Sequence, residues 1–405
     1  MQRRQKRYRE FCVKCGRRPR AGFHPFCSCG GMIDVEYDLE NAVFTDSEDS
    51  LVRYFDLLPL TSSDHFFAEA LTPTPCVHAE RLGAELGLPH LYLKDESVLP
   101  TGTTKDRMAA VALPYLIEKG VRDFCTSSTG NSSTSYARLT GLTRRCHLHL
   151  FTAERFLDRV QYADSPQVTH YVLRDATFVE AFEAARRHAE DHGFTSERGF
   201  FNLGRREGLK LAFLEAVEQI PRPIDWYVQA VSSAMGVVGT YKGARELFRL
   251  GRIQRPPRLL CVQQDSCNPM VRAFRSDSPE IRPGDVVERP TGIAAAILRG
   301  NPSRAYPYVR RDVLASGGKM LDVSEAEIRE ARSRIEEFEG LAPCFASAAA
   351  LAGLLRGVGE GVIDRGDTLL VSLTGSDRKP VGETSAVHWL RREGDGWEVE
   401  NRGRG

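Results

Sequence analysis

Neither sign of charge dominates this 405-residue sequence, because 55 Lys and Arg residues face 54 Asp and Glu residues and leave a net charge of +1. Because the charges are nearly balanced, the protein has no overall electrostatic field that would attract nucleic acid or anionic lipid, and no nucleic-acid partner is expected. Long apolar runs are also missing, since none approaches the ~20 residues of a membrane-spanning helix, and no membrane partner is expected. The basic N-terminus, residues 1–9, lacks the apolar core of a secretory signal, which predicts a cytoplasmic protein.

Two common catalytic signatures are absent from the sequence. No G-x-G-x-x-G motif occurs, which argues against a dinucleotide-binding oxidoreductase. No G-x-S-x-G motif occurs either, which argues against a serine hydrolase of the α/β-hydrolase type. Cysteine is scarce, with 10 residues, and this content fits free thiols in a reducing compartment better than a disulfide framework.

Four of these cysteines nevertheless form a cluster near the N-terminus. Cys12 and Cys15 make a C-x-x-C pair, Cys27 and Cys29 make a C-x-C pair, and glycine follows each pair. Paired thiolates on glycine-containing turns are typical of a structural zinc site. The alternatives are a zinc ion held by all four thiolates and a degenerate ribbon that folds without metal. A nucleic-acid-binding finger is disfavoured because no recognition helix follows the cysteines.

Beyond about residue 50, short apolar runs alternate with amphipathic helical patterns. This alternation predicts an α/β fold with two open parallel-sheet domains behind an N-terminal zinc-ribbon-like segment. The expected strands cover residues 91–94, 124–126, 147–151, 170–173, 226–230, 259–263 and 368–373, and the clearest helices cover 106–119 and 240–250. The expected divisions are the ribbon at 1–45, a large domain at 46–100 and 202–390, a small α/β domain at 101–201, and a tail at 391–405.

Three loops that follow predicted strands are candidate sites, because open α/β sheets bind ligands beyond the carboxyl ends of their strands. Residues 100–107 place Lys105 at the start of a helix. The positive end of the helix dipole repels a cation there, which argues against a purely structural role for this lysine. Residues 127–134 and 231–239 each lead into a helix, and their backbone N–H groups suit a carboxylate and a phosphate respectively.

These loops and several other motifs occur in an order that resembles one family. The motifs are the ribbon, LKDES at 93–97, PTG at 100–102, KDR at 105–107, STGN at 128–131, Asn202 with Arg205, YKG at 241–243, GNP at 300–302 and LTG at 373–375. Between Cys12 and Pro380 the sequence is similar to the fold-type II pyridoxal-phosphate (PLP) enzymes, related to the tryptophan synthase β chain, and within them to the threonine synthases.

The resemblance implies a role for each matching residue. Lys105 would form the Schiff base with PLP and move protons, and Thr374 would face the pyridine nitrogen. The remaining implied contacts are Asn131 to the phenolic oxygen of PLP, Ser232, Ser233, Ala234, Met235 and Gly236 to its phosphate, Ser128, Thr129 and Ser132 to the substrate carboxylate, and Lys94, Asn202 and Arg205 to a substrate phosphate. A hydroxyl opposite the nitrogen makes PLP a mild electron sink, which favours elimination and replacement over transamination. A homodimer is expected.

The substrate stays open at this point. A threonine synthase-like enzyme would convert O-phosphohomoserine and water to threonine and phosphate. A cysteate or diaminopropionate synthase-like enzyme would instead perform β-replacement on O-phosphoserine or an O-acylserine. The chain departs from the family pattern at Thr104 and at residues 343–345, which affects the substrate more than the cofactor. A catalytically silent homologue that only binds a partner is the alternative of another class.

Overall fold

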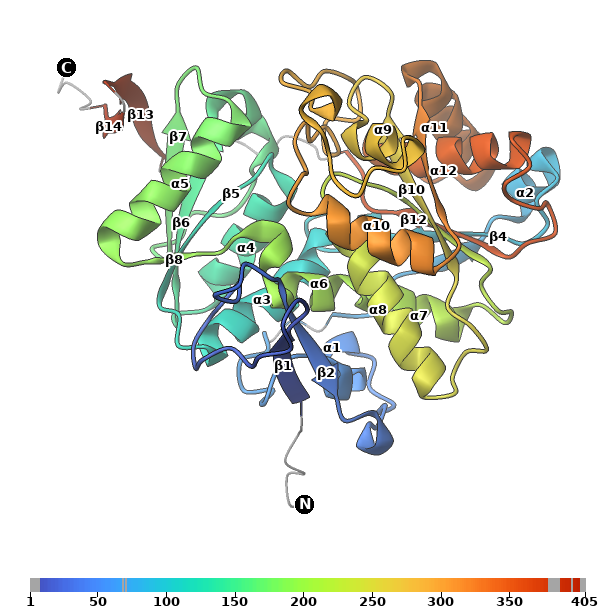
Figure 1. Cartoon of the computed structure of the whole chain (residues 1–405), viewed down its shortest axis with the longest axis horizontal. Coiled ribbons are helices and arrows are strands. Elements are labelled where there is room, and N and C mark those ends of the chain that lie inside the picture. The colour runs from blue at the N-terminus through green and yellow to red at the C-terminus, as the bar shows by residue number, and fades with distance from the viewer. Residues whose placement is uncertain (1–7, 68, 70, 378–386, 395, 401–405) are drawn as a thin grey trace. The chain divides into compact units, whose positions relative to one another are not determined.

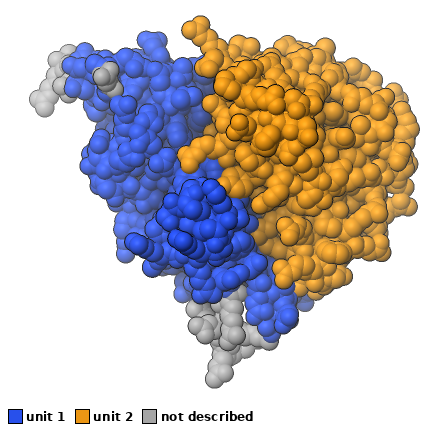
Figure 2. Space-filling view, viewed as in Figure 1, with its two compact units in different colours: residues 1–71, 105–208, 378–405 blue, residues 72–104, 209–377 orange. Residues whose placement is uncertain are grey.

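The computed structural model describes residues 8–400 except 68, 70, 378–386 and 395, so Pro380 lies outside the described residues. The chain forms two compact units, which Figure 2 shows in different colours: unit 1 comprises residues 1–71, 105–208 and 378–405, and unit 2 comprises 72–104 and 209–377. Residues 46–71 therefore group with unit 1, although the sequence-based division assigned them to the large domain. One local reason is that the carboxylate of Glu118 accepts hydrogen bonds from the backbone N–H groups of Thr61 and Ser62, at 2.9 and 3.0 Å.

Unit 2 contains a six-stranded sheet in the order β11-β10-β9-β12-β4-β3. Figure 1 labels three of these strands, β4, β10 and β12. All its strands are parallel except β3, which runs antiparallel to β4 at one edge. The strands are β3 (Cys76–His78), β4 (Leu91–Asp95), β9 (Trp226–Ala230), β10 (Arg258–Gln264), β11 (Lys319–Val323) and β12 (Leu369–Leu373). The helices are α2 (Glu80–Leu86), α7 (Leu211–Gln219), α8 (Met235–Arg249), α9 (Pro269–Arg275), α10 (Tyr306–Ala315), α11 (Glu325–Glu339) and α12 (Phe345–Gly359).

Helices cover both faces of this sheet, as the burial of its central strands requires. Every residue of β4, β9 and β12 is buried, the pattern typical of strands covered on both sides. Side chains on one face, including Leu93 and Val228, share a hydrophobic core with α12. Alternate residues point the other way, where Tyr227 packs edge-on against Phe213 of α7 at a centroid distance of 6.1 Å. The predicted open parallel sheet is thus confirmed as a mainly parallel one.

Unit 1 contains a second six-stranded sheet, in the order β14-β13-β7-β6-β5-β8, and a separate two-stranded hairpin, β1-β2. Five strands of the larger sheet are parallel, and β14 is antiparallel to β13. The strands are β1 (Tyr8–Cys12), β2 (Ile33–Tyr37), β5 (Asp123–Ser127), β6 (His147–Ala153), β7 (Val168–Leu173), β8 (Thr195–Ser196), β13 (Val387–Glu393) and β14 (Gly396–Val399). The helices are α1 (Ser50–Arg53), α3 (Lys105–Glu118), α4 (Asn131–Leu142), α5 (Phe178–His192) and α6 (Leu203–Leu209).

The C-terminal residues differ from the expectation of a tail from residue 391. Residues of β13 and β14 extend the unit 1 sheet, with β13 pairing to β7 through the register Leu390↔Leu173. Leu390 is buried in the core that α5 makes with the sheet. This burial explains why β13 joins the sheet, because removing one leucine side chain from water stabilises the added strand by about 2 kcal/mol.

Among the described residues, no helix is both long and apolar enough to cross a membrane.

Candidate active site

The candidate loops of unit 2 start from neighbouring strands. Strands β9, β12 and β4 are adjacent and parallel, so their carboxyl ends lie at one edge of the sheet. The chain leaves β9 towards β10 on one side, while β12 pairs with β9 on the other side. The loop after β9 therefore leads away from β12, and the edge formed by the carboxyl ends of the strands is the usual place for a ligand in an open α/β sheet.

A backbone clamp fixes the residues immediately before Lys105. The N–H of Thr104 donates to the carbonyl of Thr374 at 2.9 Å, and Thr103 pairs with Gly375 in an isolated antiparallel bridge. A Cβ on Gly375 would lie 2.6 Å from the carbonyl oxygen of Gly102, so this approach requires glycine. Lys105 is the next residue in the chain and the first of α3, and its side chain is half-buried.

The residues that replace the family pattern at 343–345 support the same clamp. Pro343 bridges to Ser376, and Cys344 is the N-cap residue of α12. The hydroxyl of Ser347 donates to the carbonyl of Gly375 at 2.7 Å and lies 3.3 Å from the hydroxyl oxygen of Thr374. A neutral network of hydroxyl and thiol groups therefore surrounds Thr374 on this side.

The loop after β9 forms an anion cradle at the start of α8. Ala234, the N-cap residue of α8, has φ +59°, a left-handed conformation. The backbone N–H groups that follow it are those of the helix N-terminus. Ser232 and Met235 are half-buried, whereas Ser233 and Ala234 are buried. A Cβ on Gly236 would lie 2.8 Å from the amide atoms of Gln229, so this turn of backbone packs directly on β9.

In unit 1, the loop after β5 presents hydroxyl groups at the start of α4. Ser128 accepts hydrogen bonds from the N–H groups of Gly130 and Ser133, at 3.2 and 3.0 Å. Ser128, Thr129 and Asn131 are half-buried. A loop of this kind, held in place by its own serines at a helix N-terminus, suits a carboxylate.

Lys94 occupies a different setting from the half-buried residues above. Its ammonium group donates to Glu215 and Gln219, each at 2.9 Å, and to the carbonyl of Thr74 at 2.7 Å. The residue is 1% exposed. Its predicted role as a phosphate ligand stays a prediction, and the observed contacts are those of a buried ion pair.

We expect Glu215→Ala to lower the free energy of unfolding by about 3 kcal/mol, because removing one partner leaves the Lys94 charge buried. Urea denaturation would measure the loss. The control is Glu325→Ala, which removes an exposed partner of Arg329 and should change stability by less than about 0.5 kcal/mol. Equal effects of the two variants would contradict the buried-pair interpretation.

Asn202 and Arg205 are both bound to Glu197, a residue that the sequence analysis did not single out. Asn202 donates to a carboxylate oxygen of Glu197 at 2.9 Å, and Arg205 donates to both oxygens. All three residues are buried. No local pattern in the sequence points to Glu197, because it precedes a short irregular turn rather than a motif.

The four clustered cysteines lie on the β1-β2 hairpin, as the spacing predicted. Their sulfur atoms all lie within 4.8 Å of one another, with Cys12 and Cys29 3.5 Å apart and Cys15 and Cys27 3.7 Å apart. Four sulfurs about 2.3 Å from a tetrahedral zinc ion would be about 3.8 Å apart. The N–H of Cys29 lowers the pKa of the Cys27 thiol to about 6, whereas the pKa of the Cys15 thiol in the same cluster is raised to about 11.

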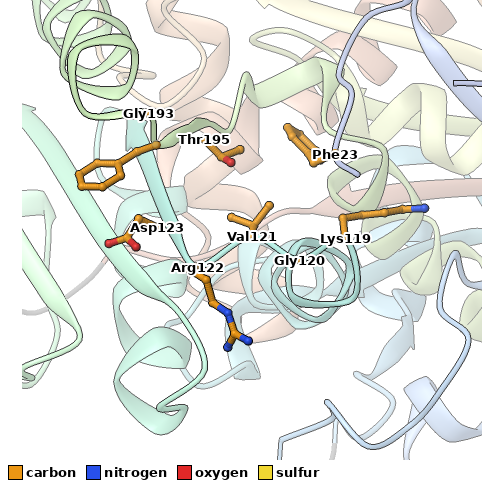
Figure 3. A pocket seen from close by; sticks show the side chains of 9 residues that line it. Phe23, Lys119, Gly120, Val121, Arg122, Asp123, Gly193 and Thr195 are labelled. Atoms are coloured by element: carbon orange, nitrogen blue, oxygen red, sulfur yellow. The ribbon is translucent and has the colours of Figure 1, made fainter. Parts of the chain in front are cut away.

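A separate cavity of about 300 Å³ in unit 1 is lined by none of the predicted site residues (Figure 3). Two of its charged lining residues have partners, since Lys119 pairs with Glu10 at 2.6 Å and Asp123 with His149 at 3.1 Å. The cavity is therefore not the predicted active site.

An α/β scaffold with helices that begin directly after parallel strands, and a lysine at the first position of one helix, is compatible with the class of enzymes that hold a phosphorylated cofactor. Residues 68–375 match the family described as "Pyridoxal-phosphate dependent enzyme". The chain belongs to this family, and the cofactor predicted from the sequence is the one that the family binds.

The relatives narrow the family. The chain is 29% identical over 378 residues to threonine synthase from Methanocaldococcus jannaschii, covering 91% of this chain and 92% of the relative. It is 28% identical over 360 residues to cysteate synthase from Methanospirillum hungatei, covering 86% and 84%. Among solved structures, maize serine racemase matches with a TM-score of 0.63 and 18% identity, covering 76% of this chain and 88% of that chain, which shows the shared fold.

The residues present fit PLP. The α8 cradle would supply backbone N–H groups for its phosphate, and the glycine at 236 leaves room for the close approach of this cradle to Gln229 of β9. The side chain of Lys105 is only half-buried, as a lysine that links to a cofactor requires. Thr374 has an uncharged hydroxyl group for the pyridine nitrogen that it is predicted to face. These residues were predicted from their positions directly after strands. Glu197 was not predicted, because no motif surrounds it.

Proposed function

We propose that this chain removes a leaving group from the β or γ carbon of an activated amino acid and adds a nucleophile in its place, with PLP as cofactor. The observation that carries the proposal is the clamp between Thr104, the residue that precedes Lys105 in the chain, and Thr374, the residue expected to face the cofactor ring. Bound PLP would supply the electron sink for negative charge at Cα of the amino acid.

The chain's own residues divide the remaining work. The N–H groups and hydroxyls at the start of α4, with Ser128 and Thr129, bind and orient the substrate carboxylate. Asn131 binds the phenolic oxygen of PLP, and residues 232–236 bind its phosphate. The amine of Lys105 takes the proton from Cα and returns it after replacement, and a positioned proton-transfer group of this kind contributes about a hundredfold or more in rate.

Two substrates have specific support. Similarity to threonine synthases supports conversion of O-phosphohomoserine and water to threonine and phosphate. Similarity to cysteate synthase, together with the carboxylate partners of Lys94 and Arg205, supports β-replacement on a serine derivative. Within the second candidate the geometry favours an O-acylserine over O-phosphoserine, because a substrate phosphate needs a cation that is not already paired.

The test is the absorbance spectrum of the purified protein, borohydride reduction, and assays with O-phosphohomoserine, O-phosphoserine and O-acetylserine. Visible absorbance with a reducible lysine link supports the cofactor, and product formation identifies the substrate. A protein that binds no PLP and converts none of these amino acids would be the catalytically silent homologue instead.

The cysteine cluster is proposed to hold one structural zinc ion. The support is that four thiolates complete a tetrahedral shell, which leaves no open position for a substrate.

We expect Thr374→Asp to redirect the reaction. An aspartate would hold a proton on the pyridine nitrogen and make the ring a stronger electron sink, so keto-acid and racemised products should appear at the expense of replacement. Product analysis by chromatography measures the ratio. Thr374→Ser, which retains the hydroxyl, should keep the wild-type ratio, and an unchanged ratio in Thr374→Asp would show that the residue does not face the nitrogen.

A further inference from the structure

Glu197 is the centre of a buried hydrogen-bond network beside the loop proposed to bind the substrate carboxylate. One of its carboxylate oxygens accepts from the hydroxyl of Tyr136 and the amide of Asn202, each at 2.9 Å. The other accepts from the hydroxyl of Thr126 at 3.2 Å and the N–H of Gly199 at 3.1 Å. Glu197 itself is 0% exposed, so solvent does not compete for these contacts.

Arg205 completes this network and is nearly saturated by it. Its Nε and Nη2 groups donate to the two oxygens of Glu197, Nη2 also donates to Thr126, and Nη1 donates to the hydroxyl of Ser132 at 3.4 Å. These contacts use four of the five N–H donors that a guanidinium has. Arg205 is 3% exposed, and its guanidinium lies over the ring of Tyr136 at 4.9 Å.

The charge state of the pair follows from these neighbours. Burial disfavours the charged guanidinium, but the adjacent Glu197 outweighs this effect and raises the pKa of Arg205. Burial also raises the pKa of Tyr136, which therefore stays a hydrogen-bond donor to Glu197. The guanidinium of Arg205 is thus held charged against the carboxylate group of Glu197. A phosphate dianion that approached Arg205 would meet the repulsion of Glu197 at close range.

Resting on the function proposed above, we propose that Glu197 is a specificity-determining residue that neutralises Arg205 and selects an amino acid whose leaving group is an uncharged acyl ester rather than a phosphate. Glu197 acts through Arg205, which in turn holds Ser132 at the start of α4. Lys94 is held by Glu215 in the same manner, so two of the cations that the sequence offered to a phosphate already have carboxylate partners.

The proposed reaction balances with an O-acylserine and a nucleophile that carries a proton. The Cα–H bond breaks and the proton passes to Nζ of Lys105, the Cβ–O bond breaks and its electron pair leaves with the carboxylate, and the nucleophile forms a bond to Cβ. Lys105 returns its proton to Cα, and the proton of the nucleophile is released with the carboxylic acid. No oxidant or reductant is required.

The test compares wild-type holoenzyme with Glu197→Gln, which removes the charge and keeps the shape. We expect the wild type to show a kcat/KM for O-acetylserine at least about tenfold above that for O-phosphoserine, and Glu197→Gln to shift this ratio by about tenfold towards O-phosphoserine. Inorganic phosphate, titrated by ³¹P NMR, should bind Glu197→Gln at millimolar concentration and leave the wild type unaffected.

Two further variants separate specificity from folding. Glu197→Asp keeps the charge and should keep the rejection of phosphate. Glu246→Gln changes a different buried carboxylate, the partner of Lys210 at 2.7 Å, and should leave the substrate ratio unchanged. If Glu197→Gln does not fold, the phosphate titration of the wild type still tests the proposal. Phosphate that binds to the wild type but not to Arg205→Lys would overturn it.

Failure of the proposed function has a different signature. A protein that converts neither ester would lack the proposed activity, while the phosphate titration, which needs no turnover, would still report whether Glu197 blocks Arg205. A wild type that prefers O-phosphoserine would retain the proposed function and refute the role of Glu197.

Discussion

Lys105→Ala should abolish the covalent link between protein and PLP and lower turnover by at least about a hundredfold, the contribution of a positioned proton-transfer group. The half-buried amine at the first position of α3 is the proposed Schiff-base group, and alanine retains the helix while it removes the nucleophile. The measurement is borohydride reduction followed by peptide mapping, alongside the visible absorbance of the purified variant.

The matched control is Lys319→Ala. Lys319 is exposed at the start of β11, so its loss should alter neither the absorbance nor the rate. Reduction that labels a different lysine in the wild type would refute the assignment of Lys105, whereas retained absorbance in Lys105→Ala would show that PLP binds without a link at this position.

The sequence predicted the parts of the structure that depend on local pattern. Strands β4, β9 and β12 are five-residue segments in which most side chains are apolar, and burial on both faces is typical of such segments. The cysteine turns were equally local, because Gly16 and Gly30 have φ of +71° and +78° and allow the chain to turn at each pair.

Tertiary pairing was not predictable in the same way. Lys94 and Glu215 are 121 positions apart, and only the packing of β4 against α7 brings them together. Arg205 and Glu197 are closer in sequence, but they meet through an irregular turn that carries no motif. Candidate cations that the sequence offered to a substrate phosphate therefore proved to have carboxylate partners, because a lysine or arginine in a buried position requires compensation of its charge.

A metal ion held by the cysteine cluster would contribute to the stability of unit 1. The ribbon packs on the rest of the unit through Phe26, which lies 4.4 Å from Phe201 between ring centroids, and through Tyr37, which donates to Glu207 at 2.7 Å. Arg206 also donates to the carbonyl of Ile33 at 2.5 Å. A ribbon that loses its shape would weaken these contacts together.

We therefore expect about one zinc ion per chain in protein purified without chelator, and Cys12→Ser to lose it. Structural zinc contributes about 10–16 kcal/mol in isolated finger peptides, so losing one ligand should lower the melting temperature by several degrees even when the core of the unit remains folded. Metal analysis and thermal melting measure both effects. Cys76→Ser, which changes a half-buried thiol in β3, should retain the zinc and serves as control.

Because the four sulfurs close the coordination shell, steady-state rates of the zinc-free protein below its melting temperature should depend on folding alone. Full stability without any metal would instead establish the hairpin as a ribbon held by its backbone hydrogen bonds and by Phe26.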